Sequence, residues 1–366
     1  MKLIISGGGT GGHVYPAIAI AHEFLSRSEK NEVLFMGAKQ GLECKLIPME
    51  NFKIITYDLA YVKGVKFASQ LVALNKLFAA VWEARKDILK FDSDILLGVG
   101  GYASSAGVIA AILSSTSLYL AEQNVRPGIT NRWLAKFAKK VFVTDAASIK
   151  YFPHGKAIVT GNPIRREFYE QNQEIPPKED NKFNLVVLGG SQGSATLNSA
   201  LAGAVKNLNK YADKLYITHQ TGEAGYKEVE NSYKDAKFEH KVLPFVYDIV
   251  DTLKRADLVI SRSGAGSIAE ISSLGKPAIY VPYPYAADDH QLSNAKEIEK
   301  ESAAIVVLDK DFDSTIVMLQ IEKLINDQPL LAQMSRNCIR LAKTDAAKVI
   351  VDELLAGKKS KDSNVI

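Results

Sequence analysis

The sequence has few cysteines, no long apolar segment and no strong excess of either charge. Its 366 residues include only Cys44 and Cys338 as cysteines, which excludes a disulfide framework and paired zinc ligands and favours a reducing compartment. No run approaches the roughly 18 apolar residues that span a bilayer, and the first residues do not resemble a signal peptide. The net charge of +4 gives no indication of nucleic-acid binding. We therefore expect a cytoplasmic globular protein that can touch a membrane without crossing it.

Two glycine-rich turns are the most informative features that the sequence does contain. KLIIS leads into GGGTGGH at residues 7–13, and NLVVL leads into GGSQG at residues 189–193. Each turn follows a short apolar strand and precedes a helical pattern. Such a loop can bind an anion, because backbone N–H groups converge there and the helix dipole adds positive potential. Two such turns at the heads of two similar halves predict two α/β domains that face a ligand cleft.

Strands alternate with helices along the whole chain, which predicts parallel sheets with helices on both faces. In the first half, we expect strands at residues 3–6, 33–37, 53–57, 95–98, 118–121, 141–144 and 157–160. In the second half, we expect them at residues 184–188, 215–219, 242–243, 258–261, 278–281 and 304–307. Helices are expected between them, the first at residues 17–28.

The prolines and charges of residues 163–182 indicate a linker between two domains. We therefore predict a first domain at residues 1–162 and a second domain at residues 183–343. A last helix at residues 344–357 and a flexible tail at residues 358–366 complete the predicted organisation.

Four glycine clusters follow predicted strands, at residues 7–12, 98–101, 189–193 and 264–266. Parallel sheets bind ligands beyond the carboxyl ends of their strands. A single cluster can be a tight turn, but four at one edge favour a ligand site.

The spacing Gly7-x-Gly9-x-x-Gly12 also matches the dinucleotide fingerprint. That fingerprint needs a carboxylate at the end of the second strand, where this chain has Ala38-Lys39-Gln40. No glycine precedes Lys-Ser/Thr at P-loop spacing. We therefore expect neither a nicotinamide or flavin cofactor nor a P-loop nucleotide.

Several polar residues beside these turns have both a structural and a chemical interpretation. His13 lies where the first turn meets its helix, and its glycine-rich surroundings favour a general base over a loop brace. Glu270 completes a capping-box pattern with Ser267, and it either closes the helix start or accepts hydrogen bonds from a ribose. Arg165 and Arg262 are either salt-bridge partners or phosphate ligands.

Residues 61–90 combine apolar positions at helical spacing with an excess of lysine and arginine. The apolar positions are Phe67, Leu71, Leu74, Phe78, Val81 or Trp82, and Leu89. Part of this face must pack on the sheet. Val62, Val65, Phe67 and Trp82, flanked by lysines, also fit an interfacial contact with an anionic membrane.

The motifs of this chain resemble those of the MurG family, in the same order and over nearly the whole length. They are GGGTGGHVYPAIAIA, GVGGYASSAGVIAA, AEQNVRPGITNRWL, TGNPIRREF, GGSQGSATLN and RSGAGSIAEISSLGKPAIYVPYPYAADDHQLSNA. The resemblance implies the α/β GT-B fold, in which two Rossmann-like, doubly wound parallel-sheet domains face a cleft and the last helix returns to the first domain. It also implies an inverting transfer of GlcNAc from UDP-GlcNAc to the 4-hydroxyl of MurNAc in lipid I, which gives lipid II for peptidoglycan synthesis.

The resemblance also implies roles for residues of this chain. For the donor, it implies UDP phosphate contacts by Ser191 and by the helix start that holds Ala265, Gly266, Ser267, Ile268 and Ala269. Glu270 would bind the ribose, the Val246 backbone would bind uracil, and Gln291 would bind the GlcNAc hydroxyls. The remaining implied contacts come from the first half: Thr10, Gly11 and Gly12 over the ligand, Asn124 near the sugar, Arg165 at the diphosphate and Tyr102 on the acceptor side. The catalytic residues that we predict are His13 as the base, Tyr102 and Glu270.

No metal and no cofactor are expected, because the glycine turns offer no Asp-x-Asp motif for a metal-bound diphosphate and Asp288-Asp289 are adjacent. The helix start with Arg165 can instead stabilise the departing diphosphate. The expected partners are UDP-GlcNAc, undecaprenyl-linked lipid I, an anionic membrane surface at the cytoplasmic face and other cell-wall synthesis proteins, but no nucleic acid. Two positions depart from the family pattern: Ser105-Ala106 stand in place of Gly-Pro, and His290 stands in place of a glutamine. Alternative functions are a GT-B transferase with another lipid acceptor, a UDP-sugar epimerase and a nucleotide-binding module without chemistry.

Overall fold

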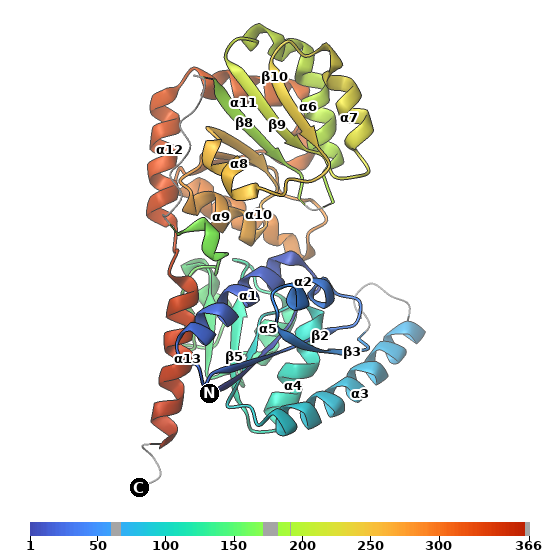
Figure 1. The fold of residues 1–366 in the computed structure, drawn as a ribbon, viewed down its shortest axis with the longest axis vertical. Helices are drawn as coiled ribbons and strands as arrows, with labels where there is room; N and C mark the ends of the chain where they lie inside the picture. Colours follow the sequence, from blue (N-terminus) through green and yellow to red (C-terminus); the bar gives the residue numbers. More distant parts are fainter. Residues whose placement is uncertain (60–66, 171–181, 191, 363–366) are drawn as a thin grey trace. The chain divides into compact units, whose positions relative to one another are not determined.

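The structure is a computed structural model that describes residues 1–59, 67–170, 182–190 and 192–362, without the side chains of residues 67–71 and 358–362. It divides into two compact units (Figure 1), Met1–Arg165 with Lys343–Ile366, and Arg166–Ala342. The chain therefore leaves the first unit at Arg165, inside the segment predicted as a linker, and re-enters it at Lys343.

Among its described residues, the first unit has a seven-stranded sheet in the order β3-β2-β1-β4-β5-β6-β7, and all of its strand pairs are parallel. The strands are β1 (Lys2–Ser6), β2 (Glu32–Ala38), β3 (Lys53–Tyr57), β4 (Ile95–Gly98), β5 (Ser117–Glu122), β6 (Lys140–Val143) and β7 (Ala157–Val159). The order reverses between β1 and β4, which is the doubly wound topology.

Helices cover both faces of this sheet, because its strands are apolar on both faces. Ile4 of β1 faces the core that is shared with α3 (Phe67–Phe91), α4 (Ser105–Leu113) and α5 (Ile129–Leu134). Its neighbours Leu3 and Ile5 face the opposite core, which α1 (Gly11–Ser26), α2 (Glu43–Met49) and α13 (Ala346–Asp362) close. Val351 and Leu354 of α13 are fully buried there.

The second unit repeats the topology of the first. Its described residues form a six-stranded parallel sheet in the order β10-β9-β8-β11-β12-β13. The strands are β8 (Phe183–Leu188), β9 (Leu215–Gln220), β10 (Glu239–Leu243), β11 (Leu258–Ser261), β12 (Ala278–Tyr280) and β13 (Ala304–Val306). The helices are α6 (Ala195–Leu208), α7 (Tyr226–Ser232), α8 (Ile249–Arg255), α9 (Ala265–Ser273), α10 (His290–Lys300), α11 (Ser314–Ile325) and α12 (Gln328–Leu341).

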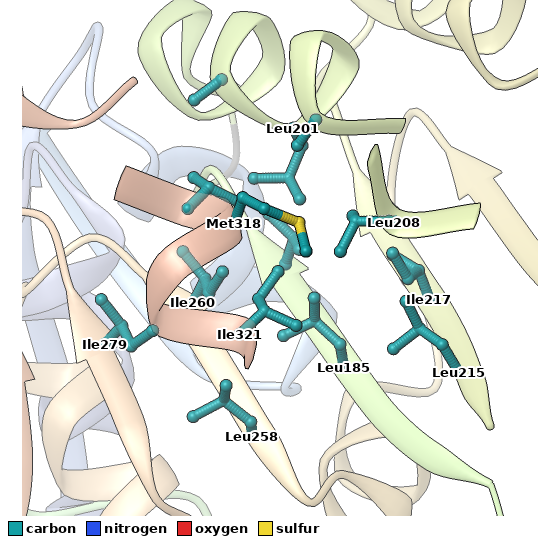
Figure 2. Close-up of a cluster of buried hydrophobic side chains, with 14 of the residues drawn as sticks. Leu185, Leu201, Leu208, Leu215, Ile217, Leu258, Ile260, Ile279, Met318 and Ile321 are labelled. Atoms are coloured by element: carbon teal, nitrogen blue, oxygen red, sulfur yellow. The ribbon is translucent and has the colours of Figure 1, made fainter. Parts of the chain in front are cut away.

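The core of the second unit lies between alternate strand residues and two helices that are far apart in sequence. Figure 2 shows Leu201 of α6 and Ile321 of α11 in one cluster with Leu185, Ile217 and Ile260 of three neighbouring strands. All five side chains are fully buried. Burial of a leucine or isoleucine side chain stabilises a fold by roughly 1.5–3 kcal/mol, so this layer fixes the sheet to its helices.

The predicted fold class of two doubly wound parallel-sheet domains is confirmed, and the differences from the predicted elements have local causes. Helix α1 begins at Gly11 rather than at residue 17, because its first turn is built from glycines that read as loop. Strand β10 begins at Glu239 rather than at residue 242, because it is an edge strand with exposed polar residues at its start. Helix α13 continues past residue 357 to Asp362. None of the helices in the described part of the chain has the length and apolarity needed to cross a membrane.

Candidate functional site

The glycine clusters lie at the topological switch point of each sheet. In the first unit they follow β1 and β4, and in the second unit they follow β8 and β11. The strand order reverses between these two strands, so the loops diverge there and leave room for a ligand at the carboxyl ends. The predicted site residues are therefore examined at these two switch points.

In the first unit, two glycine loops and His13 come into close contact. Gly101 has a φ of +74°, and a Cβ on it would lie 2.5 Å from the carbonyl oxygen of Gly8 and 2.9 Å from His13 Cδ2. The point that a Cβ on Gly100 would occupy lies 3.6 Å from His13 Nε2, 3.7 Å from Gln123 Oε1 and 3.5 Å from Asn131 Nδ2. The imidazole of His13 therefore lies against the second loop and faces buried amide groups.

The other predicted residues of the first unit gather around the start of α1. Thr10 is the N-cap of α1, and its carbonyl oxygen accepts a hydrogen bond from the His13 N–H at 3.1 Å. Gly11 lies against the ring of Tyr15, over which the Arg165 guanidinium lies 5.0 Å from the ring centroid. The chain thus brings Thr10, Gly11, His13 and Arg165 to one helix end.

Tyr102 lies across the first glycine loop. A Cβ on Gly9 would lie 3.5 Å from Tyr102 Cε1, so the ring packs on the loop backbone. Burial raises the pKa of the Tyr102 hydroxyl, and the nearby charge of Glu43 raises it further. The hydroxyl is therefore neutral at physiological pH and can donate a hydrogen bond.

Glu43 is a buried carboxylate that the sequence analysis did not identify. It accepts hydrogen bonds from the backbone N–H groups of Gly9 at 2.7 Å and Ala38 at 2.9 Å. Any side chain on Gly8 or Gly41 would overlap it. The carboxylate that the second strand lacks at its end is thus supplied from α2, and both of its oxygens already accept hydrogen bonds from backbone N–H groups. It also satisfies one amide of the loop that was expected to bind an anion.

A second buried carboxylate, Glu122, holds the loop that carries Asn124. It accepts hydrogen bonds from Asn124 N at 3.0 Å, Gly128 N at 3.1 Å and Asn131 Nδ2 at 2.9 Å. Burial raises the pKa of Glu122, and these hydrogen bonds oppose that rise. The position of Asn124 therefore depends on a carboxylate two residues before it.

In the second unit, the glycine loop after β8 packs tightly on the loop after β9. Gly193 has a φ of +78°, and a Cβ on it would overlap the carbonyl oxygen of Thr221. Gln220 Nε2 donates to the carbonyl oxygen of Gly190 at 2.8 Å. Ser191, which was predicted as a phosphate contact, lies outside the described residues.

The start of α9 carries the predicted phosphate contacts Ala265, Gly266, Ser267, Ile268 and Ala269. Its N-cap is Gly264, which has an extended backbone. Apart from its chain neighbours and the backbone of its own helix, no described atom lies within 4 Å of the Cβ position of Gly266, so this face of the helix start is open. Because the first N–H groups of a helix have no partner within the helix, the open end can bind an anion. The capping box predicted from Ser267 is wrong, since Ser267 lies inside α9.

Gln291 is held by two hydrogen bonds, and Val246 is buried. Gln291 Oε1 accepts a hydrogen bond from Tyr283 N at 3.0 Å, and Ser263 Oγ donates to the Gln291 carbonyl oxygen at 3.0 Å. Val246 is buried beside the half-exposed ring of Phe245. Glu270 lies in α9, after the predicted phosphate contacts, and is partly exposed.

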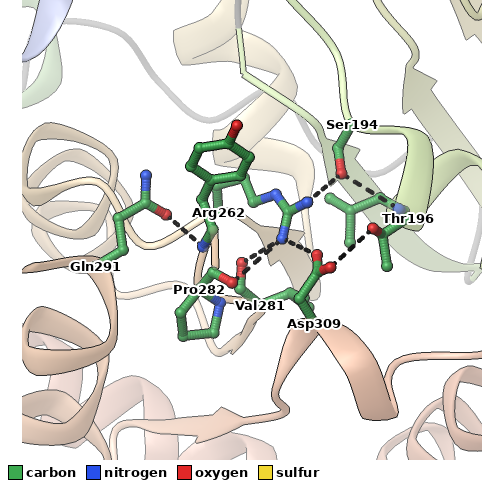
Figure 3. Close-up of polar contacts among 9 residues, drawn as sticks. Ser194, Thr196, Arg262, Val281, Pro282, Gln291 and Asp309 are labelled. Atoms are coloured by element: carbon green, nitrogen blue, oxygen red, sulfur yellow. Dashed lines mark hydrogen bonds and ion pairs between the residues drawn. The ribbon is translucent and has the colours of Figure 1, made fainter. Parts of the chain in front are cut away.

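Arg262 forms an ion pair inside the second unit, which settles one of the alternatives left open by the sequence. Its Nη1 lies 2.5 Å from Asp309 Oδ1, and its Nη2 donates to Ser194 Oγ at 2.7 Å (Figure 3). Both partners are mostly buried. Arg262 is therefore a structural cation, whose guanidinium is bound by protein groups.

Comparison with known proteins matches both units to one family. The family model described as Glycosyltransferase family 28 N-terminal domain matches residues 3–143, and that described as Glycosyltransferase family 28 C-terminal domain matches residues 184–350. The UDP-N-acetylglucosamine–N-acetylmuramyl-(pentapeptide) pyrophosphoryl-undecaprenol N-acetylglucosamine transferase of Geotalea uraniireducens is 40% identical over 97% of this chain and 98% of its own. The protein of the same name from Geobacter sulfurreducens is 38% identical over 99% of this chain and 100% of its own.

Among solved structures, MurG from Acinetobacter baumannii matches with a TM-score of 0.79 and 29% identity, over 97% of this chain and 99% of that one. The chain belongs to the MurG family. The UDP-GlcNAc 2-epimerase of Neisseria meningitidis, bound to UDP-GlcNAc, matches with a TM-score of 0.70 at 16% identity, over 97% of this chain and 100% of that one. At that identity, the likeness to the epimerase shows the fold alone, so the epimerase alternative gains nothing from it.

This member of the MurG family has a buried histidine beneath its second glycine loop. The Nε2 atom of this histidine, His219, lies 3.1 Å from Asn198 Oδ1, and His219 Nδ1 lies 3.2 Å from the Tyr233 hydroxyl oxygen. Asn198 in turn donates to the carbonyl oxygen of Thr221, the group that Gly193 approaches. Burial lowers the pKa of His219 from 6.5 to about 4.

The low pKa of His219 predicts that the second unit loses stability in mild acid. Between pH 6.5 and 4 the unfolded chain binds a proton at His219 and the folded chain does not. The free energy of unfolding should therefore fall by about 3 kcal/mol as the pH drops through this window. Urea unfolding at pH 7 and pH 4.5 measures the change. His219→Gln keeps a polar group that does not titrate, so its free energy of unfolding should depend less on pH. An equal pH dependence of this free energy in both proteins would contradict the role given to His219.

Proposed function

We propose that this chain transfers GlcNAc from UDP-GlcNAc to the 4-hydroxyl of the MurNAc unit of lipid I, and so forms lipid II for peptidoglycan synthesis. The observation that carries the proposal is the match, over nearly the full length of both chains, to transferases whose name states this donor and acceptor. An α-linked donor and a β-linked product require one inverting displacement. The reaction then needs a donor site, a base and a means of stabilising the departing UDP.

The donor site is proposed to lie at the switch point of the second unit. The open start of α9 would bind the diphosphate through backbone N–H groups and the helix dipole. Glu270 would accept hydrogen bonds from the ribose, and the Val246 backbone would bind the uracil. Gln291 would contact the sugar hydroxyls, since its amide is already oriented by Tyr283 N. Ser191 is retained as a proposed phosphate contact.

The base and the acceptor contacts are proposed to lie at the switch point of the first unit. His13 would remove the proton from the attacking hydroxyl through its neutral imidazole. Tyr102 would donate a hydrogen bond to the acceptor, because its raised pKa keeps the hydroxyl protonated. Asn124 would lie near the sugar, and Arg165 would add positive charge at the diphosphate. Thr10, Gly11 and Gly12 would close over the ligand.

The two departures from the family pattern are accommodated within the proposal. Ser105 Oγ donates to the Tyr102 carbonyl oxygen at 2.7 Å, so it braces the turn that carries Tyr102. His290 Nδ1 lies 2.7 Å from the Ala287 carbonyl oxygen, so its ring is directed at backbone. Of His290 and Gln291, we therefore propose only Gln291 as a contact to the sugar.

The test of the proposed function is a transfer assay with labelled UDP-GlcNAc and a soluble lipid I analogue. We expect release of UDP and a labelled β-linked disaccharide lipid. Formation of an epimer of the donor without any acceptor would instead identify an epimerase. UDP binding without transfer to this acceptor would contradict the proposal.

The proposed base predicts the effect of His13→Ala. Loss of a general base should lower the transfer rate by ~10²–10⁴-fold, because the attacking hydroxyl keeps its proton. The affinity for UDP, measured by calorimetry, should stay nearly unchanged. His22→Ala is the matched control, because His22 lies on the same helix and is exposed. Near-normal turnover of His13→Ala would remove His13 from the mechanism.

We further propose that the first unit binds the cytoplasmic face of the membrane through α3. Phe78 and Trp82 are 66% and 59% exposed on one stripe of this helix, whereas Val81 is buried in the core. The Arg85 guanidinium lies 5.6 Å from the Trp82 ring centroid, so cation and aromatic face the same surface. The predicted contacts Val62 and Val65, and the side chains of Phe67 and Leu71, lie outside the described residues.

A second exposed stripe strengthens the membrane proposal. Ile129, Trp133 and Phe137 are exposed on and after α5, at spacings of four residues. Helices α3 and α5 pack into the same core, so both lie on one face of the sheet. Lys136 lies 5.1 Å from the Phe137 ring centroid. Aromatic residues beside cations are the composition expected at an anionic bilayer surface.

The membrane proposal predicts flotation of the protein with vesicles that contain phosphatidylglycerol. Binding at low salt should be lost in roughly 1 M salt, where the Debye length falls to about 3 Å. The double change Phe78→Ser and Trp82→Ser should abolish flotation and leave transfer to a soluble acceptor intact. Leu319→Ser with Ile339→Ser, which changes two exposed apolar residues of the second unit, is the matched control. If the unchanged protein, the Phe78/Trp82 variant and the control variant all float equally, α3 does not contact the membrane.

A further inference from the structure

The side chain of Arg262 joins segments of the second unit that are distant in sequence. Nη1 reaches Asp309 Oδ1 and the Val281 carbonyl oxygen, the latter at 3.0 Å, and Nη2 reaches Ser194 Oγ (Figure 3). The carboxylate of Asp309 also accepts a hydrogen bond from Thr196 Oγ1 at 3.1 Å. One planar guanidinium thus holds the ends of β11 and β12, the start of α6 and the turn after β13.

Two of these contacts reach parts of the proposed donor site. Ser194 is the N-cap of α6 and directly follows the glycine loop of residues 189–193. Val281 and Pro282 lead into Tyr283, whose N–H orients the Gln291 amide. The Arg262 guanidinium also lies 5.6 Å from the Tyr283 ring centroid. Arg262 therefore connects the second glycine loop to the backbone group that orients Gln291.

The orientation of Gln291 follows from this arrangement. The amide oxygen of Gln291 accepts the hydrogen bond from Tyr283 N, and this bond sets the direction of the amide. Figure 3 shows the Gln291 nitrogen directed away from the hydrogen bond that its oxygen accepts. If the Tyr283 backbone shifts, the amide loses this partner and can turn over, so that a carbonyl oxygen replaces the nitrogen at the ligand.

Arg262 acts in this arrangement by geometry rather than by free charge. Its side chain is only 13% exposed, and Asp309 neutralises it. Lysine cannot replace it, because one ammonium lacks the fork that reaches Asp309, Ser194 and a carbonyl oxygen together.

We propose that Arg262 is a positioning residue that sets the orientation of Gln291 and thereby the selectivity of the donor site among sugars of UDP. The inference rests on the proposed function of that site. A hydrogen bond to one hydroxyl distinguishes sugars that differ in the direction of that hydroxyl, because the wrong epimer leaves a polar group without its partner. Loss of Arg262 should therefore reduce selectivity more than it reduces binding of the UDP portion.

The experiment compares Arg262→Lys with the unchanged protein on UDP-GlcNAc and its C4 epimer UDP-GalNAc. We expect kcat/KM for UDP-GlcNAc to fall by ~10–100-fold and the preference over UDP-GalNAc to narrow, because one oriented hydrogen bond is lost. The Kd of UDP, measured by calorimetry, should change by less than ~3-fold. Arg340→Lys is the matched control, because Arg340 forms an exposed ion pair with Glu301 at 2.7 Å in the same unit.

A double-mutant cycle separates positioning from general stability. If Arg262 acts through Gln291, then Arg262→Lys should not change the sugar preference any further in a Gln291→Ala background. The proposal is overturned if Arg262→Lys lowers Tm but keeps the preference for UDP-GlcNAc over UDP-GalNAc. It is also overturned if the effects of Arg262→Lys and Gln291→Ala on this preference add in the double variant. If Arg262→Lys does not fold, Asp309→Asn takes its place and should also lower the preference for UDP-GlcNAc over UDP-GalNAc. An unchanged preference in Asp309→Asn would overturn the proposal as well.

The same design distinguishes this inference from the proposed function. If the unchanged protein transfers no sugar, the proposed function fails. The affinities of UDP-GlcNAc and UDP-GalNAc, measured by calorimetry, then still show whether Arg262 sets the preference. If the unchanged protein is active and Arg262→Lys keeps its selectivity, only the role of Arg262 fails.

Discussion

Close approach of backbone to backbone at the carboxyl ends of the strands is the constraint on which both sites depend. In the first unit, Gly101 brings a loop against the Gly8 carbonyl oxygen and the His13 ring. In the second unit, Gly193 approaches the Thr221 carbonyl oxygen so closely that no side chain fits. Because parallel strands end at one edge, loops from distant sequence positions must share that edge. Glycine lets them do so while their N–H groups remain close together.

The two halves share a topology but distribute charge differently at this edge. In the first unit, the carboxylate of Glu43 already binds a glycine-loop amide, and a second carboxylate, Glu122, holds the neighbouring loop. In the second unit, the corresponding charge is the Arg262–Asp309 pair, and the start of α9 stays open. This asymmetry agrees with the proposal that the diphosphate binds at the open helix start of the second unit.

The sequence predicts most of the fold because the strands are continuous apolar runs between glycine turns. It fails where local pattern and tertiary role differ: Gly11 and Gly12 read as loop but form the first turn of α1. Glu43 could not be identified from the sequence, because it lies in the helix that follows β2 and only the fold brings its carboxylate to the backbone N–H groups of Ala38 and Gly9. The partner of Arg262 could not be identified either, because Asp309 lies 47 positions later and only folding brings the two together. The proposed role of Gln291 comes from family resemblance, whereas those of His13 and Glu270 also follow from their places beside glycine turns; the structure adds the surroundings of all three.

The return of the chain into the first unit has a consequence for synthesis on the ribosome. Helix α13 buries Val351 and Leu354 against the core formed by α1 and the strands that emerge first. Until the codons of α13 have been translated, that apolar surface on the nascent first unit has no cover. The first unit is therefore completed only after the second unit has been made. Until then, chaperones can shield its exposed apolar surface from aggregation.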